Sequence, residues 1–445
     1  MSRRLSSSRN QPLVYISPLF GEIPFLTYCP SQNITMETHL FLPMYQTATN
    51  QSNTLWSQIF PYLGATNITE LTRLYSFTTS TTLSLIQSLP QVESSQFFRD
   101  IFPIIASLAA IHPKLFQNPL PLPITQNSCL KLTRLQVASL FALSFLGVFR
   151  LPLKFQDAKQ FPRCLGITDK VAVTKFRCYM AYFSTIGIAV INNDKTLQEV
   201  VTYQRVTAQP PTWGSIDIPI TNKIDMRDGL IEDEPKDVFK SVFSSKAVGG
   251  NVLIDGCSQE EILFIKCPEC LVAMLITPFL GAIESFRIYN VIQYADVVGY
   301  AGEITFNGNI ASQKRIHNFL MFDALICVDK KLQYTRQGID RELNKVYSAI
   351  NYLDDDLDHM MPFSTGKWGC GSMLGDPRLK FLIQLMASSV SGRMMKYHPM
   401  NDPVHEKEVL LFLHSISSKV VTVRSLYNYI IQVSASNPEL LLSPY

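Results

Sequence analysis

The 445-residue sequence predicts an α/β protein in which a three-layer α/β domain follows a mainly helical accessory domain. Two observations predict this class. Apolar residues recur with helical spacing in the first part of the chain, whereas after residue 180 short β-branched or apolar runs alternate with helical runs. Such alternation is typical of a sheet covered by helices. We therefore expect an accessory domain over residues 1–180 and an α/β domain over residues 181–445.

Two helices are expected in the accessory domain. The first covers Ser95–Ala110, and the second covers Thr133–Phe149 with Thr133 as its N-cap, because threonine is a preferred capping residue. Three prolines between them, Pro119, Pro121 and Pro123, predict a turn or an extended connector.

The α/β domain is expected to contain short strands between helices. Runs rich in β-branched and apolar residues predict the strands Ile186–Ile191, Val200–Tyr203, Ile288–Tyr294 and Leu320–Val328. Longer periodic runs predict the helices Gln259–Leu275, Arg341–Asn351 and Arg378–Val390.

The composition predicts a globular intracellular protein, in the nucleus or the cytoplasm. Hydrophobic residues make up 47% of the chain, enough for a sizeable core, and the net charge of +3 does not demand a nucleic acid as direct partner. The first nine residues are basic and Ser-rich without an apolar stretch behind them, so we expect a mobile start and no leader. The most apolar run, Val137–Val148, is shorter than the ~20 residues that span a bilayer, so we expect no membrane contact.

The nine cysteines are odd in number and irregular in spacing, which does not predict a disulfide framework. The pair Cys267 and Cys270 could form half of a zinc site, but Cys327 and Cys370 are isolated, so we expect no metal and no cofactor. The acidic run Asp354–Asp356 could hold a metal, yet a solvated loop is the more common structure for such a run.

The most informative window is residues 247–261. Adjacent glycines, Gly249 and Gly250, allow the backbone to approach a ligand closely. A seven-residue spacer separates Asn251 from Gln259–Glu261, which open a predicted helix. A candidate diphosphate-binding turn and a candidate acid are thereby adjacent in the sequence.

The same window has a structural interpretation. Ser258 and Glu261 have the spacing of a capping box, in which each side chain satisfies a free amide at a helix start. Taken alone, the box favours a structural role. The paired glycines, the spacer and both glutamates together favour a functional one.

A second glycine-rich window, residues 364–376, precedes the helix predicted from Arg378. Glycines before a helix start direct backbone amides and the positive helix end toward a phosphate. The candidate ligand-binding residues of this window are Gly369, Cys370, Gly371 and Gly375.

Both windows resemble the poly(ADP-ribose) glycohydrolase family. The first is similar to the family signature of three glycines, a spacer and Gln-Glu-Glu, with Asn251 at the third glycine. The second is similar to the family segment Thr-Gly-Asn-Trp-Gly-Cys-Gly-x-x-Gly-Gly-Asp. Further collinear similarities lie at Gln136–Ala142, Val297–Ala301, Phe322–Leu325 and Arg341–Tyr347.

The resemblance implies a macrodomain-like catalytic domain behind the helical domain, acting on poly(ADP-ribose) or ADP-ribose carried by modified proteins. It implies hydrolysis of ribose–ribose O-glycosidic bonds with Glu261 as general acid, Glu260 on the ribose hydroxyls and Tyr300 against adenine. Such an acid needs a raised pKa, which a helix start opposes and burial favours. The implied substrate-binding residues are Gln259, Gly249, Gly250, Asn251, Tyr300, Gly369, Cys370, Gly371 and Gly375.

Departures from the family pattern lie at expected ligand contacts. Val242 and Ser245 stand where the family has Asp and Asn, and Lys367, Met373 and Leu374 replace an Asn, an aromatic residue and a glycine. The alternative is therefore a catalytically impaired protein that acts as an ADP-ribose reader or as a structural subunit of a larger assembly. A pocket blocked by Lys367 or Leu374 would favour this alternative.

Overall fold

A computed structural model describes residues 85–86, 88–116, 127, 129–146, 169–277, 279–351 and 360–443. The expected connector at Pro119–Pro123, the N-terminal start and the acidic run Asp354–Asp356 lie outside these residues. Within them, no helix is long and apolar enough to cross a membrane.

The described part of the accessory region is mainly helical, as predicted. The expected helix over Ser95–Ala110 contains a π-helical turn, Phe97–Ile101, and Thr133 caps the second helix by accepting a hydrogen bond from the amide of Gln136 at 3.2 Å. The elements of this region are α6 (Gln91–Gln96), α7 (Phe102–Ala110), α8 (His112–Leu115), β1 (Cys129–Thr133), α9 (Arg134–Phe145) and α10 (Lys170–Ile191).

The predicted strand Ile186–Ile191 is wrong, because these residues form the end of α10. Asp169 caps this 22-residue helix, accepting from the amide of Ala172 at 2.8 Å. The β-branched composition is local, whereas burial follows the helical period: Ile186 and Val190 are buried, and Ile188 is 57% exposed. Helix α10 runs across residue 180, and the domain division at that residue stays a prediction.

An eight-stranded mixed sheet forms the centre of the protein, with the order β1-β2-β5-β8-β4-β9-β10-β3. The pairs β1–β2, β2–β5 and β5–β8 are antiparallel, and from β8 onward each pair, through β4, β9 and β10 to β3, is parallel. The strands after β1 are β2 (Val200–Thr207), β3 (Ile224–Met226), β4 (Phe239–Ser244), β5 (Glu284–Ile292), β8 (Ile316–Asp323), β9 (Phe363–Gly366) and β10 (Met395–His398).

Three predicted strands are confirmed, with shifted ends. Val200–Tyr203 lies within β2, and most of Ile288–Tyr294 lies within β5. The segment Leu320–Val328 is a strand only up to Asp323, because β8 ends there and a loop follows.

The remaining elements cover the sheet. The predicted helix Gln259–Leu275 is interrupted after Lys266, where Pro268 opens a 3₁₀ turn, since proline removes a helical hydrogen bond. The elements are α11 (Gln259–Lys266), α12 (Ala273–Ile276), the hairpin β6 (Ala295–Val298) and β7 (Thr305–Asn309), α13 (Arg336–Ile350), α14 (Pro377–Ser391), α15 (Pro403–Ser417) and α16 (Val423–Ser436).

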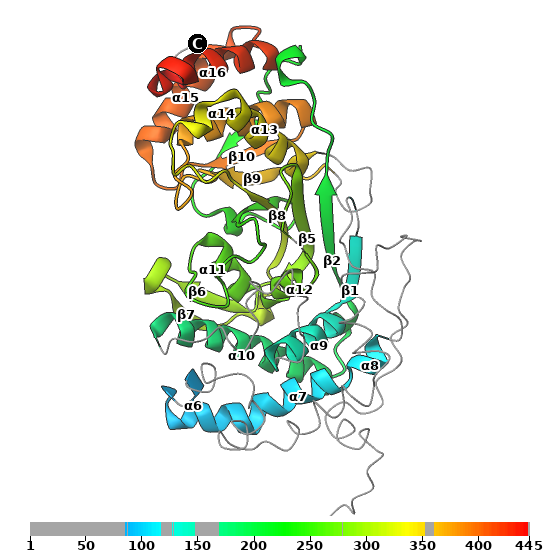
Figure 1. Ribbon diagram of the computed structural model, residues 1–445. Coiled ribbons are helices and arrows are strands. Elements are labelled where there is room, and N and C mark those ends of the chain that lie inside the picture. The colour runs from blue at the N-terminus through cyan, green and yellow to red at the C-terminus, as the bar shows by residue number, and fades with distance from the viewer. Residues whose placement is uncertain are drawn as a thin grey trace, which may run out of the picture.

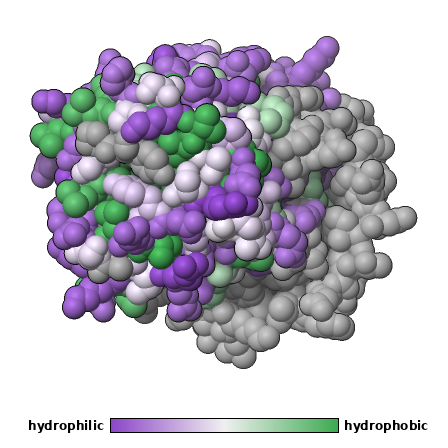
Figure 2. Space-filling view, turned by 90° about the horizontal axis from the view of Figure 1, so that it is seen from above, coloured by the Kyte–Doolittle hydropathy of each residue, from purple (hydrophilic) through white to green (hydrophobic). Residues whose placement is uncertain are grey.

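Two hydrophobic clusters fill the two faces of the sheet. Along β8, Phe319 and Met321 belong to the cluster shared with the accessory helices and α11, whereas Leu320 and Phe322 belong to the cluster under α13–α16. Figure 1 shows α13–α16 at one end of the molecule and α6–α10 at the other. Seen from the end with α15 and α16, apolar patches alternate with hydrophilic side chains (Figure 2). The three-layer α/β fold with its helical neighbour is confirmed.

A buried ion pair links the accessory helices to the layer under the sheet. Arg134, the first residue of α9, pairs with Glu269 at 2.6 Å, and both side chains are almost fully buried. Glu269 also accepts from the hydroxyl of Tyr294 at 2.7 Å and the amide of Ile292 at 2.9 Å. These bonds satisfy the buried charges that would otherwise destabilise the contact.

Candidate active site

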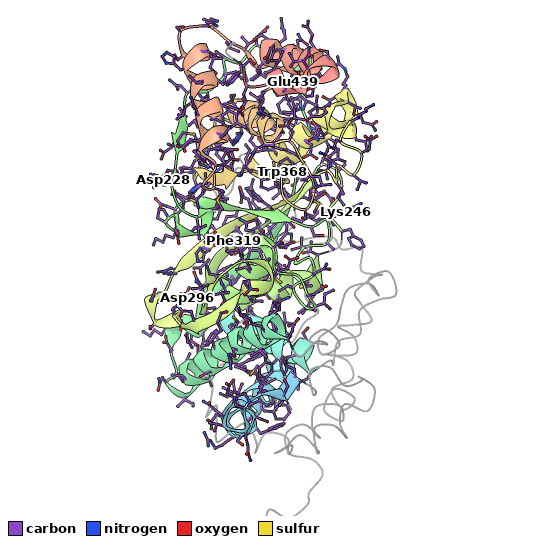
Figure 3. The ribbon with its side chains drawn as sticks, turned by 90° about the vertical axis from the view of Figure 1, so that its left-hand side faces the viewer. Asp228, Lys246, Asp296, Phe319, Trp368 and Glu439 are labelled. Carbon is purple, nitrogen blue, oxygen red and sulfur yellow. The ribbon has the colours of Figure 1, made fainter. Side chains whose placement is uncertain are left out.

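Both glycine-rich windows lie at the same edge of the sheet. The first follows β4 and the second follows β9, and these parallel strands are neighbours. Carboxyl ends of parallel strands share one edge, which is where ligands bind in open α/β sheets. In Figure 3, Lys246 marks the loop after β4 and Trp368 marks the loop after β9.

Gln259 fixes the start of α11 to the end of β4. Its Oε1 accepts from the amide of Phe243 at 2.8 Å, and its Nε2 donates to the carbonyl of Ser241 at 3.0 Å. Both polar ends of the side chain are therefore engaged by the strand. Gln259 orients the two glutamates that follow it.

Glu260 is buried and held by the backbone around the glycine pair. One carboxyl oxygen accepts from the amide of Gly249 at 2.7 Å and the hydroxyl of Ser244 at 2.9 Å, and the other accepts from the amide of Ser245 at 2.8 Å. Burial, together with the charge of Glu261, raises the pKa of Glu260 to about 8, although these hydrogen bonds favour the ionised form. Glu260 is consequently mostly protonated at neutral pH.

Glu261 occupies the site and the capping box at once. Its Oε1 accepts from the amide of Asn251 at 3.0 Å, while its Oε2 accepts from the amide of Ser258 at 2.9 Å and from the Ser258 hydroxyl. The structural and functional interpretations of this window therefore apply to the same carboxylate. Three donors at the start of α11 thus hold this one carboxyl group in place.

Gly250 lies directly against both carboxyl groups. With a φ of +49°, it adopts a backbone conformation that favours glycine. A Cβ atom there would lie 2.4 Å from Oε1 of Glu261 and 2.8 Å from Oε2 of Glu260. Gly249, with a φ of +90°, has the side chain of Met274 at 2.7 Å from its Cβ position. The paired glycines thus let the loop fold onto the glutamates.

The spacer after Asn251 forms a closed turn. The carbonyl of Asn251 accepts from the amides of Ile254 at 2.9 Å and Gly256 at 3.1 Å. A Cβ on Gly256 would lie 2.6 Å from the Cβ of Asn251, so this position needs a glycine. Sequence reasoning did not single out Gly256, although a glycine within a loop is a signal for such an approach.

The second glycine-rich loop is wrapped around a lysine that sequence reasoning missed. Lys380, near the start of α14, places its Nζ 4.2 Å from the ring centre of Trp368 and forms an ion pair with Glu342. A Cβ on Gly375 would lie 2.9 Å from Cε of Lys380, and one on Gly369, where φ is +72°, would lie 3.4 Å from Nζ. Gly375 therefore makes room for Lys380, whereas Gly369 makes room mainly for Ala324, whose Cβ would lie 2.4 Å away.

The rest of this loop faces outward to different degrees. A Cβ on Gly371 would meet no atom within 4 Å. Cys370 has its thiol 3.5 Å from the carbonyl of Trp368, and burial raises the pKa of this thiol to about 12, so it stays protonated. Asp376 caps α14 by accepting from the amide of Arg378 at 2.8 Å.

Three departures from the family pattern fit into the fold without a buried obstruction. Lys367 pairs with Asp402, the cap of α15, at 3.1 Å. Leu374 keeps a left-handed backbone, with φ of +60°, and its side chain is 49% exposed. Met373 accepts from the amide of Cys327 at 2.8 Å through its carbonyl.

The other two departures lie under the first window. Val242 is a fully buried core residue of β4, and Ser245 contributes its amide to Glu260. The substitutions thus leave the backbone contacts of Glu260 in place.

Tyr300 lies at the turn between β6 and β7, between Gly299 with φ of +89° and Ala301 with φ of +53°. Its side chain is 62% exposed. Partial burial, with the nearby charge of Glu261, raises the pKa of Tyr300. A cleft of about 120 Å³ adjoins the same sheet edge, lined by Arg227–Gly229, Pro399–Pro403 and Glu406.

Among the residues that the structure describes, no group of three or more His, Cys, Asp or Glu side chains has a metal-binding arrangement. Cys267 and Cys270 are both fully buried, and burial raises the pKa of each thiol. Their role is that of core residues.

Two parts of the chain match descriptions of one family. Residues 210–407 match the Macro domain fold of poly(ADP-ribose) glycohydrolase, and residues 89–205 match its helical domain. The chain is 25% identical to poly(ADP-ribose) glycohydrolase 1 of Arabidopsis thaliana, over 78% of this chain and 80% of that protein.

Two relatives from Caenorhabditis elegans are similar over shorter parts. The identity is 23% to poly(ADP-ribose) glycohydrolase 1, over 67% of this chain and 39% of that protein, and 26% to poly(ADP-ribose) glycohydrolase 2, over 61% and 57%. The chain therefore spans less than two thirds of the length of either. Since both of its folded parts match the two parts of one family in the same order, this chain belongs to the poly(ADP-ribose) glycohydrolase family.

Proposed function

We propose that this protein hydrolyses ribose–ribose O-glycosidic bonds in poly(ADP-ribose), releasing ADP-ribose, with Glu261 as the general acid. The carboxyl pair against Gly250 carries the proposal. Glu260 is buried and its pKa is raised to about 8, whereas Glu261 lies beside the exposed Tyr300. Two adjacent carboxyl groups in different environments suit an acid and a group that holds the sugar.

In the proposed reaction, protonated Glu261 gives its proton to the 2′-oxygen leaving group as the glycosidic bond breaks. The sugar passes through an oxocarbenium-like state, and water attacks the anomeric carbon while Glu261 takes back a proton. The Asn251 amide, the Ser258 amide and the Ser258 hydroxyl stabilise the carboxylate formed in between. Glu260 would donate to or accept from the ribose hydroxyls and orient the ring.

The substrate would lie along the sheet edge between the two glycine windows. The loop Gly369–Gly375 would hold the diphosphate, supported by the positive end of α14. The turn of Gly249, Gly250 and Asn251, whose amides are bonded within the protein, would lie against the ribose. The half-exposed ring of Tyr300 would pack on adenine. The natural substrate would be poly(ADP-ribose) on modified proteins, in the nucleus or the cytoplasm.

A second candidate is a reader that binds ADP-ribose without cleaving it. Val242 favours this candidate, because a fully buried apolar side chain stands where the family has a carboxylate. The two candidates share a binding site and differ in turnover.

Incubating the purified protein with poly(ADP-ribose) and measuring released ADP-ribose tests both. We expect release by the wild type, a loss of ~10²-fold or more in Glu261→Gln, and no loss in Glu303→Gln, an exposed surface control. ADP-ribose binding without release supports the reader. If the protein neither binds nor releases ADP-ribose, this ligand is removed from the proposal.

A further inference from the structure

Lys175 reaches from the accessory helix α10 into the first glycine window. The side chain is fully buried, and its Nζ donates to the carbonyls of Ile254 at 2.7 Å and Gly256 at 2.5 Å. Both carbonyls belong to the spacer between the glycine pair and the glutamates. Helix α10 packs against α11 and the β6–β7 hairpin (Figure 1).

A chain of hydrogen bonds runs through the spacer and links Lys175 to Glu261. The amide of Gly256 donates to the carbonyl of Asn251 at 3.1 Å, and the amide of Asn251 donates to Oε1 of Glu261 at 3.0 Å. The position of this carboxylate therefore depends on a turn that Lys175 holds by two of its carbonyls.

The charge of Lys175 acts on the same group. The ionisable groups that face it are Cys257, Glu261, Asp255 and Asp169, and those that face Glu261 are Lys175, Glu260, Cys257 and Tyr300. Burial lowers the pKa of Lys175 to about 8, so the lysine is mostly charged at pH 7 and becomes neutral above pH 8. A nearby cation favours the ionised form of Glu261.

A buried lysine is often only a structural group. Here, however, the ammonium group of Lys175 is removed from water, which costs considerable free energy. It comes from the accessory helix α10 and bonds an irregular turn beside the proposed acid. A neutral donor would also bond the two carbonyls, less strongly but without that cost. The charge is therefore the part of Lys175 that a structural role leaves unexplained.

We propose that Lys175 is a positioning residue, which fixes the spacer turn under Glu261 and holds a positive charge beside it. The proposal rests on the proposed function, in which Glu261 is the acid. It gives the helical domain a direct part in the chemistry of the macrodomain.

Three variants separate the donor from the charge. Lys175→Gln keeps a donor without charge, Lys175→Arg keeps the charge, and Lys175→Met removes both. Lys170→Met is the matched control, because Lys170 lies on the same helix but is exposed and pairs with Glu303 at the surface. Circular dichroism establishes that each variant is folded.

Two measurements do not need activity. A ¹³C titration of the Glu261 carboxyl, assigned with Glu261→Gln, should show its midpoint moved upward by about half a pH unit or more in Lys175→Gln and Lys175→Met, and unmoved in Lys175→Arg and Lys170→Met. Hydrogen exchange of residues 250–258 should rise about tenfold in Lys175→Met and stay unchanged in Lys170→Met.

Activity gives a third readout. An acid catalyst loses activity as pH rises through its titration, so the alkaline limb of the kcat profile should move to higher pH in Lys175→Gln. A purely structural lysine would lower kcat at every pH without moving the limb.

The outcomes separate the two proposals. A wild type that releases no ADP-ribose refutes the proposed function, while the titration and the exchange still decide the part of Lys175. An unmoved Glu261 midpoint in a folded Lys175→Gln overturns the charge effect, and unchanged exchange in Lys175→Met overturns the positioning. Failure of all three variants to fold assigns Lys175 to stability alone and also overturns the proposal.

Discussion

Replacing Gly250 by alanine tests the contact between the glycine pair and the two glutamates. The new methyl group would lie 2.4 Å from Oε1 of Glu261 and 2.8 Å from Oε2 of Glu260, closer than real contacts allow. Both carboxyl groups would have to move, and each is held by backbone amides. Losing one such bond costs about 1.5–3 kcal/mol, and the left-handed backbone adds about 1–2 kcal/mol for a residue with a Cβ.

We expect Gly250→Ala to lower the free energy of unfolding by about 3–5 kcal/mol and the turnover of poly(ADP-ribose) by about 100-fold, since a displacement of about 1 Å suffices for that loss. Denaturant unfolding and release of ADP-ribose measure the two effects.

Gly392→Ala is the matched control, because Gly392 also has a left-handed φ, +68°, but its Cβ position meets no atom within 4 Å. It should lose only the backbone term, about 1–2 kcal/mol, and keep full turnover. Equal stability and equal turnover of the two variants would refute the reasoning.

Three further predictions follow from burial and exposure. The pKa of Glu260 is raised to about 8 in the folded protein, so the folded state holds a proton that the unfolded state releases near pH 4.5. The wild type should therefore lose free energy of unfolding relative to Glu260→Gln by up to ~1.4 kcal/mol per pH unit from pH 5 to 8. Parallel pH curves of the two proteins in denaturant unfolding would contradict this. Tyr300→Ala should weaken ADP-ribose binding about tenfold in calorimetry without changing the melting temperature, and Tyr300→Phe should bind like the wild type. If Tyr300→Ala binds ADP-ribose as tightly as the wild type, the ring lies outside the ligand site. Val242→Asp restores the family residue but should lower the free energy of unfolding by about 3 kcal/mol or more, because the site is fully buried. Val420→Asp, at an 88% exposed position, is the control and should cost less than about 0.5 kcal/mol. An equally stable Val242→Asp with higher turnover would instead favour a wild type that has lost catalytic function.

Local signals in the sequence predicted the parts of the fold that depend on neighbouring residues. The cap at Thr133 and the β-branched run of β2 are of this kind, as is the capping box of Ser258 and Glu261. The capping role of Glu261 is confirmed, and the same carboxylate also accepts from the amide of Asn251 in the spacer. Its catalytic role stays a prediction, which residue spacing alone does not distinguish from capping.

The failures came from contacts between distant segments. The segment Ile186–Ile191 has strand composition, yet its face is fixed by the helix that enters it and by α7, against which Gly187 packs closely. The sequence did not single out Lys175, because the carbonyls that it bonds belong to a distant segment, or Lys380, because its ion-pair partner Glu342 lies on α13. Nothing in the local sequence marks such a lysine as buried.

The hydrophobic cluster shared by the accessory helices and one face of the sheet has a consequence for synthesis on the ribosome. Its members extend from Leu85 to Met321, so the accessory helices emerge long before the strands that complete their core. At a synthesis rate of ~5–20 residues per second, the apolar faces of α7, α9 and α10 would stay uncovered for about 7 to 40 seconds before β8 is made. During that interval the nascent chain exposes apolar surface, which favours aggregation. The yield of folded protein in a cell should therefore depend on chaperones that bind chains still under synthesis.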